Sequence, residues 1–165
     1  MSIEAKQIIN IMNAWAPQSL AESWDHPGLQ IGNVHTPVKK VLVALDLTAE
    51  NASYAADNGV NLIISHHPFL FRSLHEIDLG TYRGKIIETL IRSSIVSFAA
   101  HTNLDIARGG VNDVLAEKLS LSDVSGLAPA ENGYCCASWL IFLIKLVVGK
   151  KCIKLMAPNF KNVRI

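Results

Sequence analysis

The chain contains the stretch Asn61-Leu62-Ile63-Ile64-Ser65-His66-His67-Pro68, an apolar run that ends in two histidines and a proline. A short apolar run of this kind predicts a buried strand. A second run, Ile95-Val96-Ser97-Phe98-Ala99-Ala100, leads in the same way into His101. The sequence therefore predicts two buried strands that bring imidazole side chains to one edge of a sheet.

Segments with helical spacing separate these strands from each other and from a third strand expected at residues 40–47. Strands that alternate with helices of this length predict a mostly parallel sheet with helices on both faces, which is an α/β fold. Thr48 and Gly59 are suited to begin and end one of the helices. The expected helices cover residues 3–15, 49–58, 82–92 and 111–119.

The composition is that of a globular protein with one hydrophobic core. The chain has 165 residues, half of them hydrophobic and 18% charged. Residues 1–131 hold all fourteen acidic residues and nine basic ones, which gives a net charge of −5. A mildly acidic body lacks the basic surface that nucleic acid requires, so we expect no nucleic-acid partner. The start of the chain shows no signal-peptide pattern, and we expect a cytoplasmic location.

The end of the chain differs in composition from the rest. Residues 132–165 contain six basic residues, no acidic residue and all three cysteines. Their apolar run at 139–148 is too short to span a bilayer, so we expect no membrane partner. We therefore divide the chain into an α/β domain at 1–131 and an atypical tail at 132–165. The tail is either a native strand or interfacial anchor, or a truncated or frame-disrupted end.

Imidazole and carboxylate groups at the ends of neighbouring strands are the donors that a divalent metal site needs. Adjacent histidines on a strand point to opposite sides, so His66 and His67 favour two ions if the strand end bends. Pro68 favours such a bend because it restricts the residue before it. Asp105 supplies a carboxylate at the next strand end. The sequence thus predicts a dinuclear centre with His66, His67 and Asp105 as metal ligands.

His101 has a different expected role, as a catalytic proton carrier or an outer partner of the ligands. Because residues 101–105 follow a strand, we do not treat His101 and Asp105 as neighbours on a helix. The structural alternative for both is a turn closed by aspartate hydrogen bonds. Asp46 fits a turn former and a site residue equally well. The remaining histidines are expected in solvated loops, at His26, His35 and His75.

Two other features have open interpretations. Gly109 and Gly110 precede an expected helix and could let free backbone N–H groups meet a phosphate, although many helices simply begin after glycine. Phe69 and Phe71 could stack on a purine or pack in the core. The sequence does not decide between these alternatives.

Four motifs together resemble the GTP cyclohydrolase I type 2 family, also called the Nif-three-like proteins. The resemblance covers residues 1–131, the N-terminal half of a full-length member. It implies a three-layer α/β/α fold, a dinuclear metal centre with His101 close to the ligands, and a ring-shaped homohexamer. The motifs are Trp24-Asp25-His26-Pro27-Gly28-Leu29-Gln30, Ser65-His66-His67-Pro68, His101-Thr102-Asn103-Leu104-Asp105 and Gly109-Gly110-Val111-Asn112-Asp113.

The resemblance also implies a metal-dependent hydrolase of the GTP cyclohydrolase type, acting on a nucleotide-like substrate. The family's other ligands are a histidine and a glutamate near the C-terminus, whereas this chain has no histidine after His101 and no glutamate after Glu131. We therefore expect an activity impaired by loss of the C-terminal half. The alternatives are a non-catalytic metal-binding scaffold or regulatory partner, and a non-functional fragment. The donors suit two divalent ions of zinc, iron, manganese or cobalt.

Overall fold

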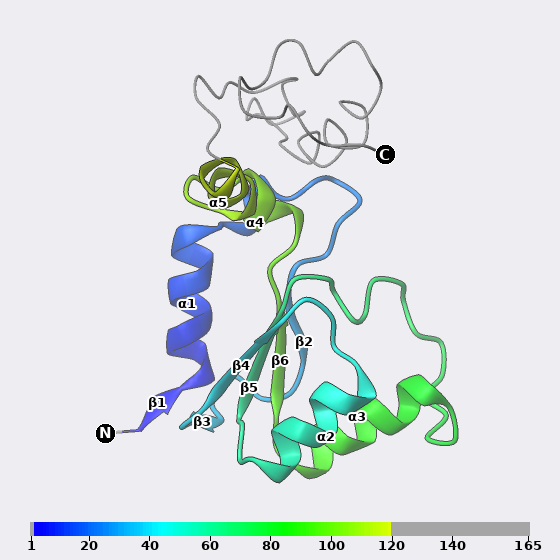
Figure 1. Ribbon diagram of the computed structural model, residues 1–165. Coiled ribbons are helices and arrows are strands. Elements are labelled where there is room, and N and C mark those ends of the chain that lie inside the picture. Colours follow the sequence, from blue (N-terminus) through cyan, green and yellow to red (C-terminus); the bar gives the residue numbers. More distant parts are fainter. Residues whose placement is uncertain (1, 120–165) are drawn as a thin grey trace, which may run out of the picture.

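A four-stranded mixed sheet forms the centre of the protein, and helices cover both of its faces (Figure 1). The structure, a computed structural model, describes residues 2–119. Three of the strands are parallel and the fourth is an antiparallel edge strand, which confirms the predicted α/β fold with a mostly parallel sheet. The strands lie in the order β2 (Gly28–Ile31), β6 (Val96–Ala99), β5 (Leu62–Ser65) and β4 (Val41–Ala44).

Strand β5 lies between two parallel neighbours and carries the candidate ligands at its end. Leu62 and Ile63 are both 0% exposed, because helices cover the sheet on the two sides to which they point. Burial on both faces explains why this strand is a continuous apolar run rather than an alternating one. Ser65 lies opposite Ala99 of β6, so the residues that follow β5 and β6 emerge at the same edge of the sheet.

Helices α2 (Ala49–Asp57) and α3 (Tyr82–Arg92) cover one face of the sheet (Figure 1). As predicted, the Thr48 hydroxyl accepts the N–H of Asn51 at 3.2 Å and so caps α2. Gly59 follows the helix with a φ of +64°, a backbone conformation that favours glycine. The core on this face consists of Leu47, Ala52, Ala55, Val60, Ile63, Ile86, Leu90 and Ile95.

Helix α1 (Ala5–Trp15) covers the other face, which gives the three-layer α/β/α arrangement. It begins two residues later than predicted, because β1 (Ile3–Glu4) pairs with β3 (Pro37–Val38) in a small antiparallel sheet. The second core joins this helix to the strands. It consists of Ala5, Ile9, Val38, Leu62, Val96, Phe98 and Ala100.

Strand β2 and the 3₁₀ helix Gln18–Leu20 were not predicted. The segment around β2 shows mainly turn residues in the sequence, and Gly28 has a φ of +115°. Its pairing with β6 also shifts register between Leu29 and Ile31. A short edge strand of this kind forms because a neighbouring strand offers hydrogen bonds, and local preference alone does not reveal it.

Helices α4 (Thr102–Ile106) and α5 (Val111–Lys118) lie beyond the carboxyl ends of the parallel strands (Figure 1). The sequence predicted α5 but treated residues 101–105 as non-helical, and that prediction is wrong. The carbonyl of His101 accepts the N–H of Leu104 at 2.8 Å and that of Asp105 at 3.0 Å. Only Ala100 and His101 separate β6 from this helix.

Gly110 allows α4 and α5 to approach closely. A Cβ at this position would overlap the carbonyl oxygen of Leu104 and lie 2.7 Å from that of Ala107. We expect Gly110→Ala to lower the free energy of unfolding by about 1–3 kcal/mol, the usual cost of overpacking. Urea unfolding measures this. Gly80→Ala is the control, because its Cβ would meet only the Asp78 side chain, at 3.1 Å. Equal midpoints for the two variants would contradict the prediction.

Residues 120–165 lie outside the described part of the chain. The domain boundary at residue 131 and the interpretation of the tail at 132–165, with its cysteines and apolar run, therefore stay predictions. Among residues 2–119, no helix combines the length and the apolar character that crossing a lipid bilayer demands.

Candidate metal centre

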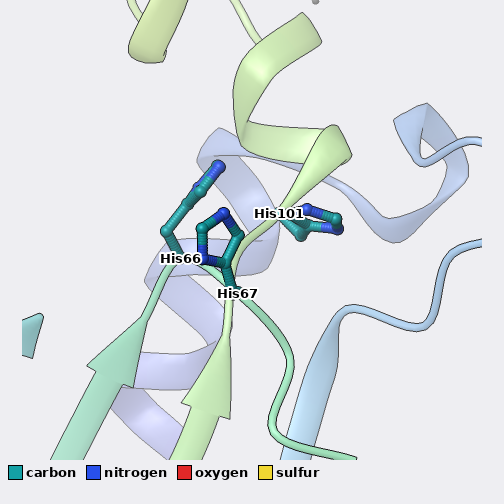
Figure 2. Close-up of side chains that lie close together, drawn as sticks. All are labelled: His66, His67 and His101. Atoms are coloured by element: carbon teal, nitrogen blue, oxygen red, sulfur yellow. The ribbon is translucent and has the colours of Figure 1, made fainter. Parts of the chain in front are cut away.

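Three imidazole side chains meet just beyond the carboxyl ends of β5 and β6 (Figure 2). His66 and His67 follow β5, and His101 follows β6. Their ring centroids are 4.9 Å apart for His66 and His67, 5.1 Å for His66 and His101, and 5.6 Å for His67 and His101. One nitrogen of each ring lies within 4.8 Å of the other two. The structure thus gathers these side chains into one donor group.

The backbone turns after β5, which allows adjacent side chains to face the same site. The N–H groups of His66 and His67 both donate to the carbonyl of Leu45, at 3.2 and 3.0 Å. The Ser65 hydroxyl donates to the carbonyl of His67 at 2.9 Å. Two successive N–H groups on one acceptor interrupt the alternation of a regular strand. The bend that the sequence analysis required at this point is confirmed.

All three imidazoles face an oxygen acceptor with Nδ1. A neutral imidazole that donates through Nδ1 keeps its lone pair on Nε2, the nitrogen that can then bind a metal. The shared hydrogen-bond pattern therefore assigns the same tautomer to all three rings. Nδ1 of His66 donates to the Ala100 carbonyl at 2.9 Å, that of His67 to Asp46 Oδ1 at 2.7 Å, and that of His101 to Asp25 Oδ1 at 2.9 Å.

The Asp105 carboxylate lies beside this group. Its Oδ1 is 3.7 Å from Nε2 of His66, is buried, and has no hydrogen-bond partner. Burial raises the pKa of the Asp105 carboxyl and lowers the pKa of the His66 imidazole, because both charged forms lose water. A buried carboxylate oxygen without a partner is costly. A bound cation would remove that cost, so the donor set fits a metal ion.

Helix α4 sets the relation between His101 and Asp105. Asp105 lies in the first turn of the helix, and its N–H donates to the carbonyl of His101. The spacing of four residues is therefore helical. It brings the carboxylate and the imidazole to the same end of the sheet, although they stand on different elements.

Asp25 is a site residue that the sequence analysis missed. Its side chain is 0% exposed, and its Oδ2 accepts the N–H of Thr102 at 3.1 Å and the Thr102 hydroxyl at 2.5 Å. Burial alone would raise the pKa of Asp25, but the hydrogen bonds from Thr102 and His101 outweigh it, and the pKa lies below its usual value. Asp25 is thus an ionised group that holds the Nδ1 proton of His101.

Comparison with known proteins identifies the family. Residues 3–156 match the family model described as Duf34/NIF3 (NGG1p interacting factor 3). The chain belongs to this family. The NIF3 assignment confirms the resemblance to GTP cyclohydrolase I type 2 proteins, since the curated relatives carry that name.

Two of these NIF3 relatives are bacterial proteins called GTP cyclohydrolase 1 type 2 homolog. The one from Halalkalibacterium halodurans is 44% identical over 122 residues, which cover 74% of this chain and 33% of the relative. The one from Listeria innocua is 50% identical over 115 residues, covering 70% and 31%. The chain spans about a third of the length of these relatives.

Solved structures of NIF3-related proteins have the same fold. A Bacillus cereus protein related to NIF3 matches with a TM-score of 0.75 and 45% identity, over 78% of this chain and 36% of that one. Reduced HcgD from Methanocaldococcus jannaschii matches with a TM-score of 0.73 and 34% identity, over 81% and 52%.

Other predicted features of this NIF3 chain lie apart from the centre or serve it indirectly. Asp46 is a site residue in part, because it holds the Nδ1 proton of His67. The N–H groups of Gly109 and Gly110 already donate to the Asp113 carboxylate at 2.6 Å and to the Ala107 carbonyl at 2.8 Å. The N–H groups of the two glycines are therefore not free for a phosphate, and the interpretation stays a prediction for the N–H groups at the start of α5. The loop histidines are exposed as predicted, at His26, His35 and His75.

The role of Asp25 can be tested by Asp25→Asn. We expect metal affinity to fall about 10–100-fold, the usual effect of altering an outer partner of a ligand. The amide has one acceptor oxygen, whereas the carboxylate serves His101 and Thr102 with two. Competition with a chelating dye measures the dissociation constant for Zn²⁺, and Asp57→Asn, on the exposed end of α2, is the control. An unchanged constant in a cooperatively folded Asp25→Asn protein would contradict the role.

Proposed function

We propose that this chain binds divalent metal ions through His66, His67, His101 and Asp105, and that it is the metal-binding part of a hydrolase acting on a nucleotide-like substrate. The observation that carries the proposal is the common hydrogen-bond pattern of the imidazoles. One nitrogen of each ring lies within 4.8 Å of the other two, the Nδ1 hydrogen bonds leave each Nε2 lone pair free, and Nε2 of His66 lies 3.7 Å from a buried carboxylate oxygen that has no partner. Such a set is arranged for a cation rather than for internal hydrogen bonding.

The chemistry of the donors limits the choice of metal. Imidazole nitrogen combined with a carboxylate oxygen suits zinc, iron, manganese and cobalt. When bound, such a metal supplies Lewis-acid polarisation and a nucleophilic water at neutral pH. Asp25, Asp46 and the Ala100 carbonyl orient the three rings by holding their Nδ1 protons. His101 lies between the other histidines and Trp24. The proton-carrier role predicted for His101 is the alternative to metal ligation, because its Nε2 can hold either a metal ion or a proton.

The finer parts of the proposal concern the number of ions, the substrate and the assembly. Four donors from two strand ends support a site for two metal ions, since the two oxygens of one carboxylate, that of Asp105, could serve both ions. The GTP cyclohydrolase name of the relatives supports a nucleotide-like substrate, and we extend to this chain the homohexamer implied by the resemblance. A cytoplasmic location, with no nucleic-acid or membrane partner, belongs to the same proposal.

A metal titration tests the proposed function. The full chain is stripped of metal with a chelator and then titrated with Zn²⁺ in a calorimeter, and GTP consumption is followed by chromatography with and without metal. We expect one or two equivalents of Zn²⁺ to bind and GTP to be consumed only by the loaded protein. Absence of stoichiometric binding would refute the metal centre.

A non-catalytic metal-binding scaffold is the second candidate function. It is favoured by the small donor set in the described part of the chain, because two ions shared among four side chains have few protein ligands each. Stoichiometric Zn²⁺ binding without GTP consumption would support the scaffold over the hydrolase.

A further inference from the structure

Two exposed aromatic side chains, Trp24 and Phe71, stand beside His101. Their ring centroids lie 6.1 and 6.4 Å from that of His101, and 6.0 Å from each other. All three contacts are edge-to-face, with interplanar angles of 67–88°. Trp24 is 55% exposed and Phe71 is 42% exposed. We refer to this pair, Trp24 and Phe71, as the aromatic rim of the metal centre.

The exposure of Phe71 is not a consequence of a loose loop. The two residues before it are tied to the body of the protein. The N–H of Leu70 donates to Gln30 Oε1 at 3.0 Å, and Arg83 donates to the carbonyl of Phe69 at 2.5 Å. Arg83 also covers the Phe69 ring at 5.3 Å, and Phe69 packs against the core under α2 and α3. Phe69 is therefore the core residue of the two, while Phe71 is held at the surface.

Trp24 is held in place by the residue that follows it. The N–H of Asp25 donates to the carbonyl of Glu22 at 2.9 Å, and its buried carboxylate binds His101 and Thr102. The backbone at Trp24 is therefore anchored close to His101 through Asp25. The backbone next to each ring of the rim is thus anchored near the metal donors, although one ring precedes β2 and the other lies in the loop after β5.

Aromatic surface left open to water next to a donor cluster is typical of a binding site. Edge-to-face packing leaves ring faces uncovered, and such faces bind planar aromatic rings by stacking. We propose that the aromatic rim stacks a planar heteroaromatic ring, such as a nucleobase, of a small molecule whose phosphate or other oxygen group reaches the metal centre. This inference rests on the proposed metal site for its second contact and defines the ligand as a ring joined to an oxygen donor.

The distances support a single ligand that spans both parts. His101 contacts the aromatic rim on one side and lies 5.1 Å from His66 on the other. A ring on the rim and an oxygen at the metal donors are thus separated by about one imidazole width. A nucleoside monophosphate is long enough to make both contacts.

Calorimetry with GMP and ribose 5-phosphate tests the proposal on the full chain. The two probes share the sugar and the phosphate and differ in the base. We expect GMP to bind the Zn²⁺-loaded chain at least about tenfold more tightly, which is the order of the contribution of stacking. Equal affinities, or no binding of GMP, would overturn the proposal.

Variants separate stacking from a structural effect. Trp24→Ala and Phe71→Ala should each weaken GMP binding about tenfold and leave ribose 5-phosphate and Zn²⁺ binding unchanged. Trp24→Phe keeps a ring and should retain most of the GMP affinity. Tyr54→Ala is the matched control, because Tyr54 is an aromatic residue on α2 with 56% exposure. Unchanged GMP affinity in both alanine variants would overturn the proposal.

The two proposals fail separately. The Zn²⁺ titration judges the metal centre without any nucleotide. The comparison of GMP with ribose 5-phosphate is repeated on the metal-free chain, where the rim is still present. A preference for GMP that depends on Trp24 would support the aromatic rim even if the metal centre were refuted.

Discussion

Replacing His66 with alanine is expected to abolish stoichiometric metal binding. The loss of affinity should exceed the roughly 10–100-fold that follows from altering an outer partner, because the donor itself is removed. His66 is central to the site: its ring lies 4.9 Å from that of His67 and 5.1 Å from that of His101. Its Nε2 also faces the unpartnered oxygen of Asp105. The variant therefore removes the one donor that lies next to all of the other three, His67, His101 and Asp105.

Metal content after dialysis against Zn²⁺ and the visible absorption of Co²⁺ measure this effect. His75→Ala is the control, because His75 is an exposed loop histidine outside the donor group. The control should bind metal like the unaltered chain. Urea unfolding of the metal-free proteins checks that both variants fold. A folded His66→Ala protein with undiminished metal content would rule out the proposed centre.

The main architecture was predictable because the sequences of the buried strands are continuous apolar runs. Leu62 packs on the face covered by α1, and Ile63 packs on the face covered by α2 and α3. Only a strand that is covered on both faces requires apolar residues at successive positions. Strand β2 was not predictable in the same way. It forms because β6 offers a free edge for pairing. Its sequence lacks a regular strand pattern, because it begins at Gly28 with a positive φ and its pairing shifts register between Leu29 and Ile31.

The candidate site was partly predictable for a topological reason. Parallel strands end at the same edge of a sheet, so histidines that follow two such strands must meet. The direction of neighbouring side chains in a loop has no such rule, and Phe69 and Phe71 could not be assigned to core and surface. The helix at 102–106 was missed because its first hydrogen bonds go to His101, which follows β6 after a single residue.

The hydrogen-bond partners of the histidines could not be predicted from the spacing of residues in the sequence. Asp25 precedes His101 by 76 residues, and no local pattern connects them. The one available signal was the motif around Trp24, which the resemblance contained but for which no chemical role was apparent. The pairing becomes visible only when the segment before β2 is placed against the start of α4.

Asp105→Asn is expected to stabilise the metal-free protein at neutral pH and to remove its response to metal. The carboxylate is buried, and its Oδ1 has no hydrogen-bond partner. An amide at this position carries no charge and can donate to Nε2 of His66. We expect a gain of up to about 1–3 kcal/mol in the free energy of unfolding, the cost of an unpaired buried acceptor. Urea unfolding with and without Zn²⁺ measures both effects.

The pH dependence of this gain follows from the direction of the pKa shifts. Burial raises the folded-state pKa of Asp105 above its unfolded value. Below the unfolded pKa, near 3.9, both states are protonated and the variant has no advantage. As the pH rises through the folded pKa, the unaltered chain loses stability, and the loss is complete above that value. The advantage of Asp105→Asn should therefore grow as the pH rises above about 3.9, reach its full size above the folded pKa and persist from there upward.

His66 modifies this advantage in mildly acidic solution. Burial lowers the pKa of His66, so the metal-free fold loses stability as the pH falls from about 6.5 towards the folded value. The Asp105 charge opposes that loss because it favours protonated His66. The variant lacks this charge, and its advantage should be greatest above pH 6.5. Asp57→Asn, an exposed carboxyl replacement, should show no comparable pH dependence.

Metal should reverse the order of stability. A ligand at a hundred times its dissociation constant stabilises the protein that binds it by about 2.7 kcal/mol. The unaltered chain should gain this amount in Zn²⁺, whereas Asp105→Asn should gain little, so that the two denaturation curves exchange places. A residue that destabilises the metal-free fold and stabilises the loaded one is retained for binding rather than for folding. If Asp105→Asn were less stable without metal, or responded fully to Zn²⁺, Asp105 would be a structural residue and not a ligand.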